Sequence, residues 1–172
     1  MKLLLTSAGI KNASIRSALV EMLDKPIAEC SALCIPTASY ANPNGPSSAW
    51  NFVSGQCCWM KQSGLADLLP SLRDTVYVGL SAGSMVMAPR IGEWFVGWRP
   101  PEGGDETLGL VDFAMFPHLD HEELPYNTMA YAEQWAVEMT VPSYAMDDET
   151  ALRVVDGEVD VISEGHWKLF AP

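Results

Sequence analysis

Long apolar runs are missing from this sequence. The apolar opening MKLLL gives way at once to the polar TSAGIKN, and no later run approaches the eighteen or so residues that a membrane-spanning helix needs. The opening is also too short for the apolar core of a secretory signal peptide. We therefore expect a soluble, cytoplasmic protein that has no membrane partner.

Positive charge is scarce as well. Ten lysines and arginines stand against 22 aspartates and glutamates, for a net charge of −12, which argues against nucleic acid as a partner. Only four cysteines occur, and none are spaced as in the C-x-x-C pairs of zinc sites. We expect them to be reduced, with Cys34 in the core and Cys57 and Cys58 as buried packing thiols; a redox role for this adjacent pair is the alternative.

What is present alternates between strand-like and helix-like segments. The length of 172 residues suits a single domain, residues 1–172, with a sizeable core. Expected strands are 2–7, 32–38, 76–81 and 109–118; expected helices are 12–23, a segment from 50, 59–69 and 127–139. After residue 143 the segments are short and alternate, with turns at Asp156-Gly157 and Glu164-Gly165, which predict antiparallel hairpins. The pattern predicts an α/β fold with a parallel sheet and a small antiparallel tail.

One junction in this pattern has a shape suited to catalysis. VYVGLSAGSMVMAP (76–89) runs from a strand candidate through Gly-Leu-Ser-Ala-Gly into an apolar helix-like segment. G-x-S-x-G between a strand and a helix is typical of a nucleophile elbow, a sharp turn that lifts the serine hydroxyl above the sheet. Ser81 is then the nucleophile, and the backbone N–H of Ala82 would stabilise an oxyanion. The alternative is a close-packed glycine turn with Ser81 as a helix N-cap.

A serine nucleophile needs a base, and only three histidines occur, His118, His121 and His166. His118 ends the strand candidate GLVDFAMFPH, which places it at the carboxyl edge of the sheet beside the elbow. His121 belongs to the polar DHEE that follows, and His166 to the last turn of the tail. We therefore expect His118 to be the base; its alternative is a polar cap on the strand end.

These segments together resemble a known family. GLSAGSMVMAP, LGLVDFAMFPHLDH and the tail YAMDDETALRVVDGEV are similar to the S51 serine peptidases, the family of dipeptidase E. KLLLTSAG and CWMKQSGLADLLPSL fit as well, so the resemblance covers most of the chain. It implies a flavodoxin-like, class I glutamine-amidotransferase-like three-layer fold, with Ser81 and His118 as the catalytic pair and without a metal or cofactor. It also implies cleavage of short peptides behind an N-terminal residue, often aspartate.

The acid that completes a triad is less well defined. The family places an acidic residue between the serine and the histidine, and Glu93 is nearest in position; the segment also holds Glu102, Asp105, Glu106 and Asp112. Asp120 could orient His118 locally. The run His118 to Glu123 has metal-binding side chains, but its spacing is not H-E-x-x-H and prolines frame it as a loop, so we expect no metal there.

The chain departs from the family in one segment. Family members carry a further strand and a Gly-Gly-Asn or Gly-Gly-Asp turn before the helix that matches CWMKQSGLADLL, whereas here WNFVSGQ runs directly into it. Gly9 could supply the second oxyanion N–H in place of that turn. A second subunit could complete the shortened sheet, since an open strand edge pairs readily, and we expect a homo-oligomer.

A substrate aspartate would need a cation close to the nucleophile. Arg90 and Arg99 are the candidates, and Asp120 is the third residue expected to bind substrate. Three functions follow: a serine exopeptidase for short peptides, favoured by the resemblance; a catalytically silent relative that acts in binding or assembly; and an esterase or amidase that uses the same serine and histidine.

Overall fold

Two small sheets and the helices around them make up the described chain. The structure, a computed structural model, describes residues 1–35, 50–96 and 104–172, with only the backbone given for 50–55. The larger sheet has the strand order β2 (Val76–Leu80), β1 (Lys2–Thr6), β5 (Thr150–Val155), β6 (Glu158–Ser163). The smaller has the order β3 (Ala114–Phe116), β4 (Ser143–Met146), β7 (Trp167–Phe170). β1 and β2 pair in parallel, as do β3 and β4, and the other pairings are antiparallel.

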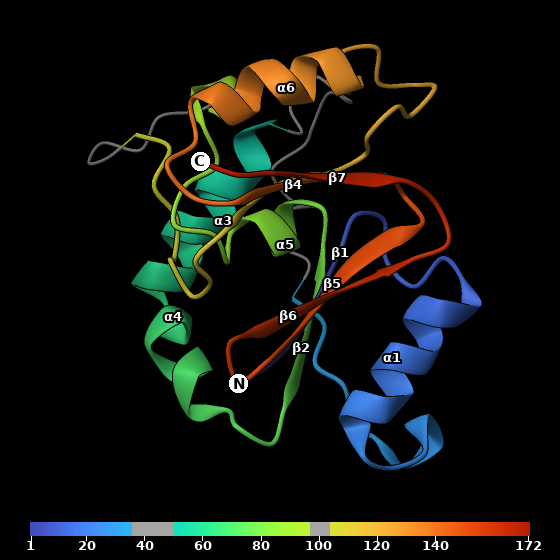
Figure 1. Cartoon of the computed structure of the whole chain (residues 1–172). Coiled ribbons are helices and arrows are strands. Elements are labelled where there is room, and N and C mark those ends of the chain that lie inside the picture. The colour runs from blue at the N-terminus through green and yellow to red at the C-terminus, as the bar shows by residue number, and fades with distance from the viewer. Residues whose placement is uncertain (36–49, 97–103) are drawn as a thin grey trace.

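Helices cover both faces of the larger sheet (Figure 1). α1 (Ala13–Leu23) lies on one face, while α3 (Trp50–Gln62), α4 (Leu65–Leu68) and the short α5 (Ala82–Met85) lie on the other; α6 (Met129–Val137) covers the smaller sheet. Single 3₁₀ turns occur at Ile27–Glu29, Leu69–Ser71 and Glu93–Phe95. The α/β, flavodoxin-like fold class predicted from the sequence is confirmed.

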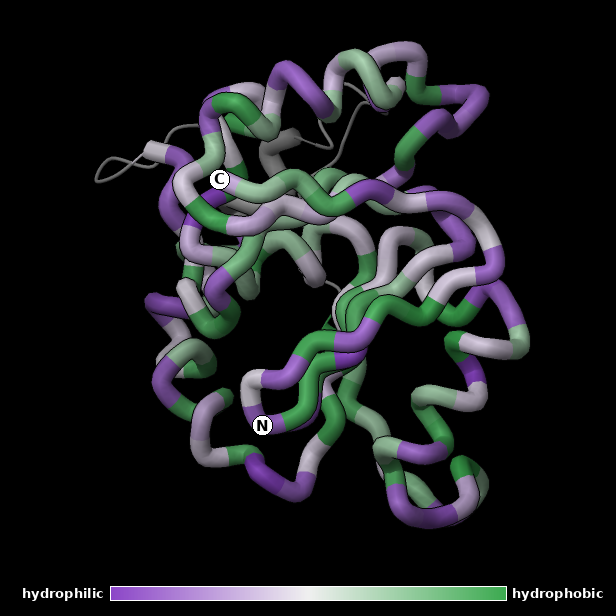
Figure 2. Tube along the Cα trace, in the orientation of Figure 1, coloured by the Kyte–Doolittle hydropathy of each residue, from purple (hydrophilic) through white to green (hydrophobic). Residues whose placement is uncertain are grey.

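The alternation of β1 explains why helices are needed on both faces. Leu4 packs with Ile15, Ala18 and Met22 of α1 in the smaller apolar cluster, whereas Leu3 and Leu5 point the other way into the larger one. Successive strand residues face opposite sides, so an apolar run such as KLLL can be buried only between two layers. Figure 2 shows the corresponding hydrophobic stretch where the strands of the larger sheet run together.

Aromatic contacts join the smaller sheet to the helices around it. Phe95 and Phe116 meet edge to face with ring centroids 5.3 Å apart. The ring centroid of Trp135, on α6, lies 5.6 Å from that of Phe116. The indole N–H of Trp135 donates to the carbonyl of Ile91 at 2.7 Å, so this buried aromatic is also satisfied as a hydrogen-bond donor. These contacts fix the end of β3, from which His118 projects.

Three expectations about secondary structure need correction. Residues 32–35 are not a strand and Cys34 is exposed rather than in the core, while 36–38 lie outside the described residues. Only Ala114–Phe116 of 109–118 is a strand, because Leu110 and Val111 donate their N–H groups to the carbonyl of Met87 instead of to a neighbouring strand. The expected helix 59–69 breaks at Gly64, whose φ is 75°.

The tail forms one of its two expected hairpins. β5 and β6 pair around Asp156-Gly157 as expected, but after Glu164-Gly165 the chain crosses to the other sheet, where β7 pairs with β4. Asp147 joins the end of β4 to the start of β7: its carboxylate accepts the N–H of His166 at 2.6 Å, and its own N–H donates to the carbonyl of His166.

No helix in the described ranges is long and apolar enough to cross a membrane. Between β1 and β2 the residues that the structure describes, 7–35 and 50–75, are helical or irregular, and α3 runs unbroken through WNFVSGQCCWMKQ, so the extra strand that the resemblance implies does not occur within these two ranges.

Candidate active site

The chain turns sharply between β2 and α5, and Ser81 occupies the turn. Its backbone has φ 49° and ψ −113°, a region that non-glycine residues rarely adopt. The N–H of Ser81 donates to the carbonyl of Thr6 on β1 at 3.1 Å, and its carbonyl accepts the N–H groups of Ser84 and Met85. The strained residue is thus held on both sides, which leaves its side chain directed away from the sheet.

The two glycines of the elbow have different roles. A Cβ at Gly79 would lie 2.8 Å from Cα of Ser84, a contact that the backbone cannot relieve. A Cβ at Gly83 would meet its nearest neighbour, the hydroxyl of Tyr77, at 3.6 Å, which is an ordinary contact. Gly79 therefore permits the close approach of α5 to β2, and Gly83 is not sterically required.

His118 also sits in a strained turn, at the end of β3. Its φ is 58°, although it is neither glycine nor asparagine. Buried Asn127 closes the turn, because its side-chain amide donates to the carbonyl of Pro117 at 2.9 Å and its carbonyl accepts the N–H of Asp120 at 2.6 Å. Leu119 donates its N–H to Met146 at the end of β4, which fastens the turn to the smaller sheet.

The two turns bring the predicted nucleophile and base together. Nε2 of His118 lies 2.8 Å from the hydroxyl oxygen of Ser81, and Nδ1 lies 2.7 Å from Oδ1 of Asp148, in the turn between β4 and β5. A carboxylate at Nδ1 favours the tautomer in which Nδ1 carries the proton, so that Nε2 is free to accept the serine proton. This is the connectivity of a serine, histidine and acid triad.

The structure corrects the choice of acid. Glu93 is exposed in the 3₁₀ turn Glu93–Phe95, while both ring nitrogens of His118 are engaged by Ser81 and Asp148. Among the other acids weighed between serine and histidine, Asp105 pairs with Arg90, Glu106 and Asp112 are exposed, and Glu102 lies outside the described residues. Asp148 lies outside the segment between serine and histidine in which the resemblance implies the acid, but YAMDD places it just past a strand end, the same kind of position as that of His118.

The two expected oxyanion donors differ in availability. The N–H of Gly9 donates to the buried hydroxyl of Thr6 at 2.8 Å, so it is already used within the loop after β1 and the expectation for Gly9 is corrected. The N–H of Ala82, in the first residue of α5, has no acceptor among the described residues. Ala82 thus remains the candidate donor beside the Ser81 hydroxyl.

Arg90, the one expected substrate-binding arginine that the structure describes, is paired with a neighbouring carboxylate. Nε of Arg90 donates to Oδ2 of buried Asp105 at 2.7 Å, and this hydrogen bond raises the pKa of Arg90. The same carboxylate oxygen accepts the N–H of Gly92, so the pair organises the loop after α5. Arg99 lies outside the described residues.

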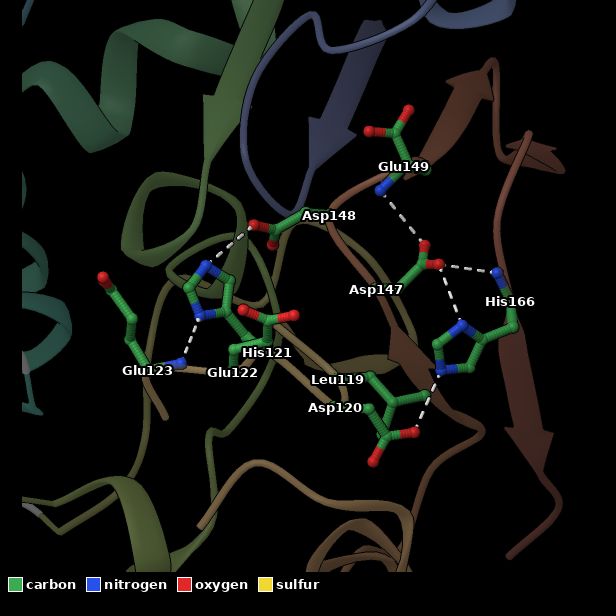
Figure 3. Close-up of a pocket in the computed structure, with 9 residues that line it drawn as sticks. All are labelled: Leu119, Asp120, His121, Glu122, Glu123, Asp147, Asp148, Glu149 and His166. Atoms are coloured by element: carbon green, nitrogen blue, oxygen red, sulfur yellow. Dashed lines mark hydrogen bonds and ion pairs between the residues drawn. The ribbon is translucent and has the colours of Figure 1, made fainter. Parts of the chain in front are cut away.

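A pocket of about 470 Å³ opens beside the acid of the triad (Figure 3). His166 lies between two carboxylates, with Nδ1 3.0 Å from Asp147 and Nε2 3.0 Å from Asp120, and His121 reaches Oδ2 of Asp148 at 3.6 Å. Among the described residues the lining is strongly acidic and includes no lysine or arginine; it consists of Leu119, Asp120, His121, Glu122, Glu123, Asp147, Asp148, Glu149 and His166.

His121, Asp120 and His166 are thus placed together in one pocket, although the sequence alone linked only the first two. Despite this density of ligand-type side chains, the described residues contain no group of three or more histidines, cysteines or carboxylates arranged to hold a metal ion. Asp120 also accepts the N–H of Met129 at the start of α6, which orients its side chain at the pocket wall.

Fold and site together define an α/β protein in which a serine, a histidine and a carboxylate are in continuous contact beside the turn from β2 to α5. The family model for peptidase family S51 matches residues 57–162. The chain therefore belongs to peptidase family S51, a family of serine peptidases. No curated protein matches the chain.

Two solved structures share the fold. A candidate peptidase E protein from Listeria monocytogenes EGD-e superposes with a TM-score of 0.53 at 19% identity, over 66% of this chain and 56% of that protein. A peptidase from an acI-B1 Actinobacterium superposes with a TM-score of 0.56 at 12% identity, over 99% of this chain and 93% of that one. This chain thus spans just over half of the Listeria protein and nearly all of the actinobacterial one.

Proposed function

We propose that the protein is a serine exopeptidase that hydrolyses short peptides, with Ser81 as nucleophile, His118 as base and Asp148 as the acid. The observation that carries this proposal is the continuous contact from Ser81 through the His118 ring to Asp148, at 2.8 and 2.7 Å. A hydroxyl within hydrogen-bond reach of an imidazole that a carboxylate orients is the arrangement that activates serine for attack.

In this mechanism the hydroxyl oxygen of Ser81 attacks the carbonyl carbon of the peptide bond while its proton passes to Nε2 of His118. The tetrahedral intermediate places its negative oxygen near the N–H of Ala82, and Asp148 stabilises the imidazolium. Collapse breaks the C–N bond, and His118 returns the proton to the leaving amine. A water molecule, deprotonated by the same histidine, then hydrolyses the acyl-enzyme and restores Ser81.

The neighbouring pocket supports an exopeptidase. A free peptide N-terminus carries a positive charge, and a pocket lined by carboxylates that shares Asp148 with the triad favours such an ammonium group. The aspartate preference implied by the family resemblance needs a cation; Arg90 is engaged by Asp105, so in this proposal the preference depends on Arg99. Recognition of the ammonium group does not depend on that arginine.

Covalent labelling followed by a substrate panel tests the proposal. A fluorophosphonate should label the wild-type protein and not the Ser81→Ala variant. Asp-Leu, Leu-Leu and Lys-Leu should be hydrolysed, and their N-acetylated forms should not, because acetylation removes the ammonium charge. Absence of labelling and turnover would favour a silent family member, and turnover of a p-nitrophenyl ester without any dipeptide would favour an esterase.

A further inference from the structure

We propose that Ser7 is a positioning residue that holds His118 and Asp148 in register; this inference rests on the proposed function. Ser7 follows directly after β1, which lies between β2 and β5, and its side chain is fully buried, with an exposed fraction of 0%.

The hydroxyl of Ser7 contacts both partners of the catalytic serine. It accepts the backbone N–H of His118 at 2.7 Å and donates to Oδ1 of Asp148 at 3.2 Å. Oδ1 is also the oxygen that receives Nδ1–H of His118 at 2.7 Å. The contacts close a ring in which the backbone and the imidazole of His118 are joined through Ser7 and Asp148.

This ring of contacts holds the backbone of His118, which the end of β3 does not hold by itself. His118 has a φ of 58°, and its N–H lies beyond the end of β3, where no strand ladder is available to hold it. A hydroxyl has one proton and two lone pairs, so Ser7 can accept this N–H and still direct its own proton to the carboxylate. Alanine offers neither function, so Ser7→Ala would leave the partly buried N–H of His118 without this partner and remove one hydrogen bond that holds the Asp148 carboxylate.

Asp148 has a competing partner on its other side. His121 lies 3.6 Å from Oδ2, and its Nδ1 accepts the N–H of Glu123, so its Nε2 carries the proton that faces Asp148. One carboxylate therefore stands between two imidazoles, and the Ser7 hydroxyl bonds the oxygen on the His118 side. Ser7 acts through Asp148 and His118 and does not touch the reacting atoms.

Ser7→Ala is the decisive variant, and Ser143→Ala is its matched control. Ser143 is equally buried and begins β4, at the opposite end of that strand from Asp148. Its hydroxyl donates only to the carbonyl of Val141. We expect Ser7→Ala to lower kcat by about 10–100-fold with little change in KM, as for a catalytic group held in slightly wrong geometry. Ser143→Ala should keep wild-type kcat despite a comparable loss in Tm.

Two further measurements separate positioning from a general loss of stability. In a double-mutant cycle, Ser7→Ala should add less than about threefold to the loss caused by Asp148→Asn, because both act through one carboxylate. The downfield proton resonance of Nδ1–H, assigned by its absence in His118→Gln, should broaden or vanish in Ser7→Ala and persist in Ser143→Ala. If Ser7→Ala does not fold, Ser7→Cys, which keeps the volume but bonds weakly, provides the same comparison.

Unchanged kcat and an unchanged Nδ1–H resonance in Ser7→Ala would overturn the inference, as would full additivity with Asp148→Asn. The Nδ1–H resonance of His118 is measured on protein that has not reacted with substrate or label, so the measurement does not require the proposed activity. If wild-type Ser81 takes no fluorophosphonate label, the proposed function fails while the resonance still decides whether Ser7 positions His118.

Discussion

Ser81 and His118 sit in two turns that look alike in outline and differ in what supports them. Each follows a strand at the edge of its sheet, and each places a non-glycine residue at positive φ, 49° for Ser81 and 58° for His118. The serine turn is supported mainly by its own residues, by Gly79 and hydrogen bonds within residues 81–85, and the bond from the N–H of Ser81 to Thr6 is its one distant backbone contact among those described. The histidine turn is supported by Ser7 and Asp148, which are far away along the chain, and by Asn127, which follows ten residues after Pro117.

The difference shows two ways of holding a reactive side chain in a strained conformation. A turn stabilised by its own residues carries a short sequence motif and can be recognised without a structure. A turn stabilised by side chains from other elements carries no such motif, because each contributor is an ordinary polar residue in its own segment. The second kind also ties the site to the integrity of the whole fold.

The largest effect should come from removing either reactive side chain. Ser81→Ala and His118→Ala should each lower kcat/KM for a dipeptide by at least about 10³-fold. The kcat/KM of the double variant should be no lower than that of the less active single variant, since serine and histidine act as a unit. Steady-state kinetics on all three proteins, with circular dichroism to confirm folding, makes the measurement; a double variant that loses the product of the two factors would show two independent roles.

A smaller loss is expected when the acid is changed. Asp148→Asn should lower kcat by about 10²–10⁴-fold, because an amide cannot stabilise the imidazolium or hold the required tautomer. Glu93→Gln is the matched control and should keep activity within about threefold, since neither ring nitrogen of His118 contacts Glu93. Equal losses in the two variants would restore Glu93 as a contributor to catalysis.

Substitution of the two elbow glycines should show which one is sterically required and which one only matches the G-x-S-x-G motif. Gly79→Ala should destabilise the protein by about 1–3 kcal/mol and lower activity, because the new Cβ would be 2.8 Å from the backbone of Ser84. Gly83→Ala, in helical α5, should be neutral or slightly stabilising, because the new Cβ would make only ordinary contacts, the nearest with the Tyr77 hydroxyl at 3.6 Å. Urea denaturation of the two variants gives the comparison, and similar unfolding free energies would show that α5 can shift away from β2.

Substitutions on the exposed edge of β2, the strand that leads into the Ser81 turn, are expected to affect catalysis least. β2 exposes Val78 by 44% and Leu80 by 57%, whereas every residue of β3, the histidine's strand, is buried. We propose that β2 mediates homo-oligomer formation, because an apolar edge strand is a ready pairing surface. Light scattering at micromolar concentration should report a dimer or larger, and Val78→Lys should give a monomer of unchanged kcat; a wild-type monomer would contradict the proposal.

The sequence predicts the local parts of this molecule well. KLLLT, VYVGL and the segment around Asp156-Gly157 form strands and a hairpin because alternation and turn residues act within a few positions. The placement of Ser81 follows from its flanking glycines, and that of His118 from its position at a strand end. These features depend on neighbours along the chain.

What the sequence does not predict depends on distant partners. Asp148 is one of 22 acidic residues, and only the pairing of β4 with β3 brings it to the His118 ring. The crossing of β7 to the other sheet depends on Asp147 reaching His166, and the engagement of the Gly9 N–H depends on the conformation of Thr6. The pairing of Arg90 with Asp105 depends on how the loop after α5 folds back, and it takes up the arginine that the sequence offers for substrate binding.

The residues proposed for catalysis are divided between the two sheets. Ser81 follows a strand of the larger sheet, His118 follows a strand of the smaller one, and Asp148 lies in the connection from β4 to β5, where the chain passes from one to the other. A shift of about 1 Å between the sheets would break the contact at 2.8 Å while leaving every strand intact. On gradual heating, peptide hydrolysis should therefore be lost several degrees below the temperature at which the circular dichroism signal changes. The rate of turnover then reports on the contact between the two sheets while every strand is still folded.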